Sequence, residues 1–123
     1  MVFKTLSSKE KKKYFEKLQS ILISRKLFLK NDFSLPKLAE ETGIQLYIIS
    51  HVVNSQTNSH FNDYVNLMRI QYFKEKINDM EWKDLTVKKM TAACGFKSRT
   101  TAYRAFIRHI EMTPSDYLKL NRS

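Results

Sequence analysis

The chain has 123 residues, of which 42% are hydrophobic and 28% charged, with only two Gly, two Pro and one Cys. This length suits one domain or two very small subdomains and excludes a large multidomain enzyme. The composition is that of a folded protein rather than a disordered or collagen-like one. Because so few turn-forming residues cannot punctuate a many-stranded sandwich, the sequence predicts an all-α fold with helices joined by short connections.

The net charge of +10, from 22 basic and 12 acidic residues, favours a polyanionic partner, either nucleic acid or a membrane surface. The excess lies at the two ends: residues 1–30 carry +7, residues 31–78 carry −1 and residues 79–123 carry +4. No apolar stretch is long enough for a bilayer span, and residues 1–18 carry lysines where a signal peptide has its apolar core. We therefore expect no membrane insertion of this segment and a cytoplasmic location. The single Cys94 agrees with a reducing compartment.

The first helix is predicted to begin with a capping box in Ser7-Ser8-Lys9-Glu10. Apolar residues then recur at helical spacing as far as Leu22, with Lys11, Lys12 and Lys13 largely on the solvated side. The lysine run is most simply a solvated face. The alternative is that it contacts phosphates or a membrane surface.

A second helix is predicted after Ser34, with Pro36 in its first turn, and it should end at Thr42-Gly43 because glycine readily takes the left-handed conformation. Ile44 resumes the apolar pattern in a sharp turn before a third helix. The residues of the third helix predicted to face inward are Ile49, Val52 and Val53.

Residues 60–78 predict a longer connecting helix, about 28 Å long at 1.5 Å per residue. Residues 79–85 break the pattern, and Trp82 within them is interpreted as an anchor of the second half's core. Thr86 is predicted to cap a fifth helix that ends at Cys94-Gly95. The residues of the fifth helix predicted to face inward are Val87, Met90 and Ala93.

Ser98 is predicted to start a sixth helix with Ala102, Ala105, Phe106 and His109 on one side. The last helix has the clearest boundary, because Thr113-Pro114-Ser115-Asp116 combines a capping threonine, proline at the first helical position and an acid in the first turn. Seven helices and no convincing strand result.

An internal repeat links the two halves. Gly43-Ile44 matches Gly95-Phe96 at an offset of 52. With one inserted residue the offset becomes 53, and it pairs Val53 with Phe106, Asp63 with Asp116 and Tyr64 with Tyr117. The unit is a helix, a glycine turn, a second helix and a capped helix. Such a helix-turn-helix exposes its second helix to a major groove about 12 Å wide, so two units imply two grooves.

The sequence resembles the DNA-binding domain of AraC-family transcription regulators over nearly the whole chain. The residues that carry the resemblance are Leu38-Ala39 before Gly43, Ser50, Tyr64, Arg69, Cys94-Gly95-Phe96-Lys97-Ser98, Arg104-Ala105-Phe106 and Thr113-Pro114-Ser115-Asp116-Tyr117. The resemblance implies seven helices that form two helix-turn-helix subdomains: residues 1–58 with the basic first helix, the connecting helix 59–78, and residues 79–123.

The resemblance also implies a function: a bacterial, sequence-specific regulator of transcription that binds double-stranded DNA and inserts two recognition helices into successive major grooves. The chain is then expected to act alone or as the C-terminal output domain of a larger sensor, with RNA polymerase or an upstream sensor or dimerisation domain as partner. The alternative of a different class is a helical protein-interaction module with incidental basic charge.

Two departures from the family pattern affect the local geometry. Asn58 and Glu111 stand where the family usually has glycine after each recognition helix, and Glu tolerates the left-handed conformation less well than Asn. We therefore expect the second connection to take a different local path. Ala102 stands where a large apolar residue is usual, so the sixth helix is expected to sit closer or rotated.

In the second unit, the predicted base-facing residues are Arg99, Thr100, Tyr103 and Arg104, and the predicted phosphate contacts are Lys97, Ser98 and Arg108. An arginine that pairs with both acceptors of a guanine contributes about 1–3 kcal/mol of discrimination. The simpler alternative for these arginines is a solvated helix face.

In the first unit, the predicted base-facing residues are Leu46, Tyr47, Ser50 and His51, with Asn54 on phosphate. The alternative is that Tyr47 only packs and His51 lies in solvent. Arg69 in the connecting helix is left open between a structural contact and a DNA contact. We expect the second unit and the basic flanks to supply most of the salt-sensitive affinity.

No catalytic arrangement is recognised. Cys94 and the three histidines lack metal-ligand spacing, and Cys94 is interpreted as a small core residue, with catalysis by it a distant third hypothesis. The sequence contains no paired nucleophile and base, phosphate loop or metal motif. It therefore predicts neither an enzyme nor a small-molecule cofactor.

Overall fold

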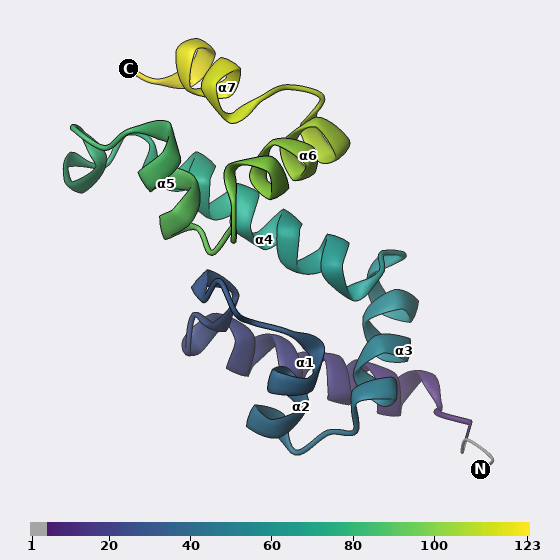
Figure 1. Ribbon diagram of the computed structural model, residues 1–123. Helices are drawn as coiled ribbons and strands as arrows, with labels where there is room; N and C mark the ends of the chain where they lie inside the picture. The colour runs from purple at the N-terminus through teal and green to yellow at the C-terminus, as the bar shows by residue number, and fades with distance from the viewer. Residues whose placement is uncertain (1–4) are drawn as a thin grey trace. The chain divides into compact units, whose positions relative to one another are not determined.

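The computed structural model describes residues 5–123, and this part of the chain contains seven α-helices, two short 3₁₀ helices and no strand (Figure 1). The elements in chain order are α1 Ser8–Ser24, η1 Leu27–Leu29, α2 Leu35–Thr42, α3 Leu46–Thr57, α4 Phe61–Lys76, η2 Met80–Trp82, α5 Val87–Ala93, α6 Arg99–Ile110 and α7 Pro114–Asn121. The all-α prediction is confirmed. The connecting helix α4 has 16 residues and is shorter than the predicted span of 60–78.

The helices form two compact units. The first contains residues 5–27 and 34–64, which include α1, α2, α3 and the start of α4. The second contains residues 28–33 and 65–123, which include η1, the rest of α4 and α5 to α7. Residues 28–33 thus follow α1 in sequence but belong to the second unit.

Polar side chains cap the predicted helix starts. At α1, the Glu10 amide donates to Ser7 Oγ and the Ser7 amide donates to Glu10 Oε1, both at 3.1 Å, so the capping box is confirmed. The hydroxyls of Thr86, Ser98 and Thr113 each accept from the amide three residues on, at 3.0–3.2 Å. Ser34 occupies the cap of α2 in an extended conformation but makes no such bond.

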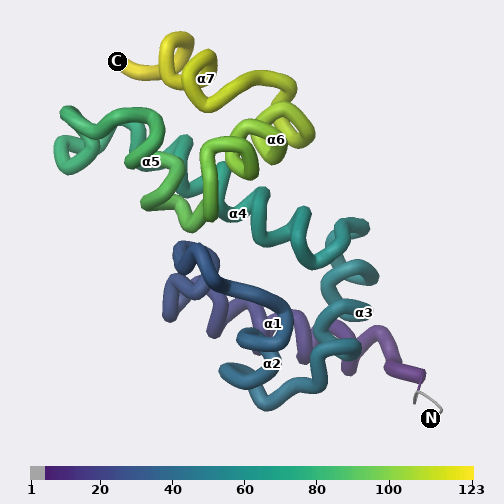
Figure 2. The backbone as a smooth tube through the Cα atoms, in the orientation of Figure 1, coloured from purple at the N-terminus to yellow at the C-terminus, as the bar shows by residue number. Residues whose placement is uncertain are grey.

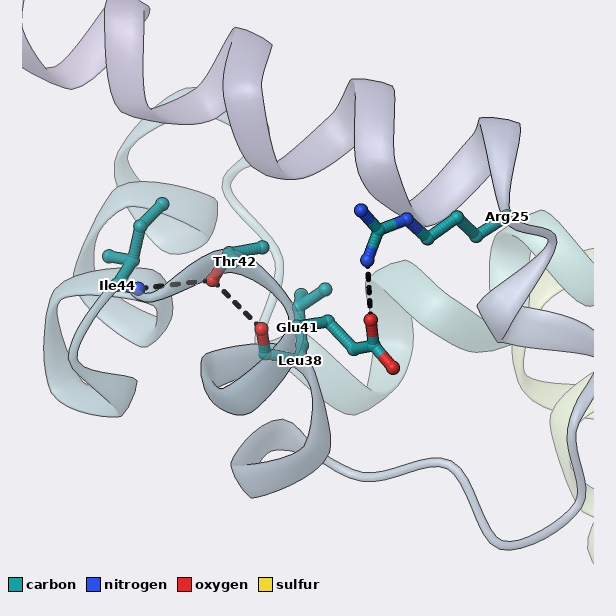
Figure 3. Close-up of polar contacts among 5 residues, drawn as sticks. All are labelled: Arg25, Leu38, Glu41, Thr42 and Ile44. Carbon is teal, nitrogen blue, oxygen red and sulfur yellow. Dashed lines mark hydrogen bonds and ion pairs between the residues drawn. The ribbon is translucent and has the colours of Figure 1, made fainter.

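Left-handed residues end three of the helices: Gly43 after α2, Asn58 after α3 and Glu111 after α6. A threonine precedes two of them. The Thr42 hydroxyl donates to the Leu38 carbonyl at 2.8 Å and accepts from the Ile44 amide at 3.2 Å (Figure 3). Thr57 repeats this arrangement with Val53 and Ser59. The hydroxyl therefore serves backbone groups on both sides of the left-handed residue.

The expectation of a different path at Glu111 is wrong. Glu111 has φ 57° and ψ 26°, and Asn58 has φ 56° and ψ 24°. In both cases the amide of the left-handed residue donates to the carbonyl four residues earlier, Ile107 or Asn54. This backbone bond is available to any residue type except proline, so the helix ends in the same way although glutamate occupies this conformation at a cost of about 1–2 kcal/mol.

The first unit has an aliphatic core. Its fully buried side chains are Leu18, Leu22, Leu38, Ile49, Val52 and Val53. They come from α1, α2 and α3, which pack on one another in pairs. At the edge, Phe15 lies 5.9 Å from the ring of Tyr64, whose hydroxyl accepts from Gln19 at 3.2 Å. The predicted docking of the apolar stripe of α1 is confirmed, and the outer lysines are mostly solvated.

An exposed ion pair links two helices of this core. Arg25, directly after α1, contacts Glu41 in α2 (Figure 3). The two side chains are 54% and 40% exposed, so solvent screening limits the contribution of the pair to about 0–1 kcal/mol. The packing of α1 against α2 therefore depends on the buried aliphatic residues.

The second unit has an aromatic core. The rings of Phe73 and Phe106 meet edge to face with centroids 5.0 Å apart, and Trp82 approaches Phe73 at 6.1 Å. Trp82 is only 5% exposed, so its predicted role as an anchor is confirmed. The second core thus relies on large, shape-specific side chains.

One inward prediction in α5 is wrong. Ala93 is exposed, whereas Thr91, which was not predicted, is buried. The buried face of α5 extends from Met90 through Cys94 to Thr91, and at about 100° per residue Ala93 lies on the far side of Met90 from the other two. The Thr91 hydroxyl donates to the Lys88 carbonyl at 3.2 Å, which makes its burial tolerable.

Cys94 is a core residue, as predicted, with no exposed surface. Burial raises the pKa of its thiol to about 12, and the positive charge of Arg69 opposes this only in part. The neutral thiol is the unreactive form, so at neutral pH Cys94 is poorly suited to act as a nucleophile.

The left-handed conformation of Glu111 gives a test of helix-end energetics. Glu111→Gly should raise the free energy of unfolding by about 0.5–1 kcal/mol, because relief of left-handed strain exceeds the added entropy of the unfolded chain. Urea denaturation measures the change. Asn58→Gly is the matched control and should change stability less, because Asn already tolerates this conformation. A destabilised Glu111→Gly chain would contradict the assignment.

The burial of Cys94, the only cysteine, gives a second test. At about pH 8, a thiol-reactive disulfide reagent should modify the native chain at least roughly two orders of magnitude more slowly than the chain in concentrated guanidinium chloride. Absorbance of the released thiol measures both rates. Equal rates would show that Cys94 is not held in the core.

Candidate nucleic-acid interface

Helix α3 presents one buried and one solvated face. Ile49, Val52 and Val53 are fully buried, which confirms their prediction as inward residues. The solvated face holds all five residues predicted as first-unit contacts, which are Leu46, Tyr47, Ser50, His51 and Asn54. Tyr47 is half-buried, and the other four are exposed. The structure thus brings these five residues together on one side of a single helix.

Helix α6 has the same organisation. Ala102, Ala105 and Phe106 are buried, and His109 is half-buried at the end of the stripe. The predicted residues Arg99, Thr100, Tyr103, Arg104 and Arg108 are all exposed. The buried positions of α6 correspond one to one with those of α3, so the same face of each helix is turned inward.

The two helices are in register at an offset of 53. Both have 12 residues, and each ends at a left-handed residue. The register pairs Leu46 with Arg99, Tyr47 with Thr100, Ser50 with Tyr103, His51 with Arg104, Asn54 with Ile107 and Ser55 with Arg108. Equivalent positions of the two solvated faces therefore carry different chemistry.

The inserted residue of the repeat lies in the second turn. Gly43 is followed by two residues before α3 begins, whereas Gly95 is followed by three before α6 begins. Figure 2 traces the backbone between α2 and α3 and between α5 and α6. The longer turn ends in Lys97 and Ser98, both exposed. Ser98 Oγ accepts from the Thr101 amide at 3.1 Å and lies 2.8 Å from Thr101 Oγ1, whereas Gln45 makes no side-chain cap bond. The inserted residue, Lys97, thus adds a cation to the second unit, and Ser98 in place of Gln45 adds a side-chain cap to α6.

Two exposed residues on these faces were missed by the sequence analysis, Ser55 and Ile107. Ile107 is 39% exposed and lies one turn after Tyr103, which is 53% exposed. The repeat offset of 53 identifies both, because Ser55 is the equivalent of Arg108 and Ile107 is the equivalent of Asn54. The solvated face of α6 therefore combines three arginines with an apolar pair.

Charge differs between the two faces. The solvated face of α6 carries Arg99, Arg104 and Arg108 and no acid, whereas that of α3 carries no Lys or Arg. Over the described units, the first (residues 5–27 and 34–64) has eight basic and five acidic residues, net +3, and the second has 13 and seven, net +6. The positive charge of the first unit comes from residues 5–27, which carry +5, whereas residues 34–64, which include α3, carry −2.

Arg69 does not belong to either solvated face. It is only 8% exposed and donates from Nε to the Phe28 carbonyl at 2.7 Å and from Nη2 to the Lys30 carbonyl at 3.0 Å. Of the two interpretations left open by the sequence, the structure shows the structural one.

Other kinds of site are not recognised among residues 5–123. No group of three or more metal-ligating side chains is present in this range. Within the same range, no helix combines the length and the hydrophobicity needed to cross a membrane.

Comparison with solved structures gives the fold. A Listeria innocua protein of unknown function is 22% identical, with 88% of this chain and 97% of that chain covered and a TM-score of 0.74. The C-terminal domain of AraT, a response regulator from Geobacillus stearothermophilus, is 16% identical over 89% and 85% of the two chains, with a TM-score of 0.72. The DNA-binding domain of AdpA, solved with a target DNA, is 18% identical over 85% and 91%, with a TM-score of 0.69.

No curated protein matches the chain. A family model described as a helix-turn-helix domain, of the AraC type, matches residues 38–120, which include α3, α6 and both glycine turns. The chain therefore belongs to the AraC-type helix-turn-helix family and is a DNA-binding transcription regulator.

Proposed function

We propose that the chain recognises a specific sequence in double-stranded DNA through α3 and α6, which enter successive major grooves. The observation that carries this proposal is the matched pair of 12-residue helices, each with one stripe buried and the opposite face solvated. A helix about 10–12 Å across fits a major groove about 12 Å wide. The fold likeness to the DNA-bound AdpA domain supports the same use of this fold.

In the second unit, Arg99, Thr100, Tyr103 and Arg104 face base edges. The guanidinium groups pair with guanine acceptors, and Lys97, Ser98 and Arg108 hold phosphates. Because Ser98 already caps α6, its own hydroxyl is partly engaged, and the cationic side chain of Lys97 supplies the stronger phosphate attraction. Tyr103 with Ile107 provides an apolar surface for a thymine methyl group.

In the first unit, Leu46 and Tyr47 meet thymine methyl groups, and Ser50 and His51 bond base edges, with Asn54 on a phosphate. These contacts involve no fixed positive charge. Their contribution to affinity therefore depends little on salt, whereas that of α6 depends on it strongly.

The site acts within a larger regulatory process. We propose that the chain works in the cytoplasm and that RNA polymerase, or an upstream sensor or dimerisation domain, reads out or controls its binding. The affinity of the isolated chain for DNA is the part of this proposal that is tested first.

Fluorescence anisotropy with labelled duplexes tests DNA recognition. A preferred duplex, selected from a random pool, should bind more tightly than a random duplex, and log affinity should fall linearly with log salt because bound phosphates release counterions. Arg104→Ala should reduce the preference by about 5- to 150-fold, equivalent to 1–3 kcal/mol. Arg108→Ala should weaken both duplexes alike and reduce the salt slope by about one.

Lys119→Ala in α7 is the matched control, because it also removes one exposed positive charge from the second unit but lies off α6. It should leave the preference intact. Equal effects of Arg104→Ala and Lys119→Ala would contradict the assignment of α6. Absence of any duplex preference in the wild-type chain would contradict sequence-specific binding and favour a protein-interaction module.

A further inference from the structure

The segment 28–33 lies outside the matched family region of residues 38–120, yet it is packed into the second unit. Its main-chain carbonyls at Phe28 and Lys30 accept the two hydrogen bonds from Arg69 in α4. The planar guanidinium fixes the distance and direction between its donors, so the bonds hold two points of the segment at once.

Arg69 also contacts the turn that leads into α6. Its Cζ lies 5.7 Å from the centroid of the Phe96 ring. Phe96 is 3% exposed and lies 6.0 Å, centroid to centroid, from Phe106, which is the largest buried side chain of α6. One buried arginine therefore bridges the segment 28–30 and the aromatic ring that packs beneath α6.

Gly95 allows this close approach. A Cβ atom at Gly95 would lie 2.4 Å from the Phe28 carbonyl oxygen and 2.9 Å from both Arg69 Nε and the Leu29 carbonyl carbon. The equivalent position at Gly43 has no atom within 4 Å. Both glycines have positive φ, at 98° and 72°, but only Gly95 has its α-carbon pressed against another segment.

We propose that Arg69 is a positioning residue for DNA recognition: by clamping the backbone of residues 28–30 against the Gly95-Phe96 turn, it sets the placement of α6 within the second unit. The inference rests on the proposed function. It extends the machinery of α6 to a segment that precedes the first helix-turn-helix in sequence. Residues 28–30 therefore take part in recognition by the second unit without touching DNA.

The burial of Arg69 explains why the clamp is sensitive to change. Desolvation lowers the pKa of Arg69, and Cys94 opposes this only in part, so burial disfavours the charged guanidinium. The two backbone carbonyls and the ring of Phe96 compensate for this cost in the folded chain. Loss of the segment would leave a charge without its acceptors, and loss of the arginine would leave two carbonyls without their donor.

Arg69→Met in the full chain removes the donors and keeps an unbranched apolar side chain. Circular dichroism should show that the variant keeps its helix content. Cys94, next to Gly95, should nevertheless become more reactive towards the thiol reagent, because the turn is no longer held in place. The base pairs read by α6 are identified as those whose recognition is lost in Arg104→Ala. In Arg69→Met, the preference for these base pairs should fall about tenfold, which is within the range of one base contact. Preference at base pairs sensitive to Ser50→Ala should persist. Arg104→Ala should add little to Arg69→Met, because both act on α6.

Arg69→Lys should restore part of the preference, because an ammonium group donates to one of the two carbonyls. Gly95→Ala and Gly43→Ala form the matched pair of backbone variants. Both strain a left-handed position, but only Gly95→Ala should expose Cys94 and reduce the α6-dependent preference. Should Arg69→Met fail to fold, the graded effects of Arg69→Lys and Gly95→Ala decide.

The two proposals fail in different ways. A wild-type chain without duplex preference overturns the proposed function. The positioning role of Arg69 is overturned by a different result, in which the wild-type chain has such a preference and the variants behave like it. In that result, Gly95→Ala and a folded Arg69→Met or Arg69→Lys chain keep both the α6-dependent preference and a protected Cys94. A loss spread equally over base pairs read by α3 and α6 also overturns it, because it would indicate general destabilisation.

Discussion

Burial of one stripe of α3 and one stripe of α6 is the constraint on which the rest of the structure depends. Ile49, Val52 and Val53 in the first unit, and Ala102, Ala105 and Phe106 in the second, are almost completely removed from water. Since successive residues of a helix are about 100° apart, fixing three inward positions also fixes which side chains point outward. The outward position of Arg104 or Ser50 is in this sense a consequence of hydrophobic burial elsewhere on the same helix.

The duplicated frame accommodates two different cores. The first unit fills its interior with aliphatic side chains, and its glycine turn at Gly43 is open to its surroundings. The second unit uses Phe73, Trp82 and Phe106, whose larger rings need more exact placement, and its turn at Gly95 is enclosed by Phe28, Leu29 and Arg69. Glycine is therefore needed for its left-handed conformation in both turns. At Gly95 it is needed in addition because the backbone of residues 28 and 29 approaches closely.

Features determined by neighbouring residues could be predicted from the sequence, and features determined by distant ones could not. The caps at Ser7, Thr86, Ser98 and Thr113 involve partners three residues away, so their patterns are visible locally. The acceptors of Arg69 lie 39 and 41 residues earlier in the chain, and no periodicity indicates them. At Glu111 the side-chain preference, which is visible in the sequence, is outweighed by the backbone hydrogen bond to Ile107, which is not.

The unequal chemistry of the two solvated faces follows from small changes on this common frame. One additional residue after Gly95 supplies Lys97, and serine in place of Gln45 supplies a helix cap. Three arginines stand where the α3 face has Leu46, His51 and Ser55. Coulombic attraction to phosphates acts over about 10 Å at moderate salt, whereas apolar and hydrogen-bond contacts act only on close approach. In the proposed function, the arginines of α6 therefore serve early capture of the duplex as well as base recognition, whereas the contacts of α3, with Leu46, Tyr47 and Ser50, form only once its groove is occupied.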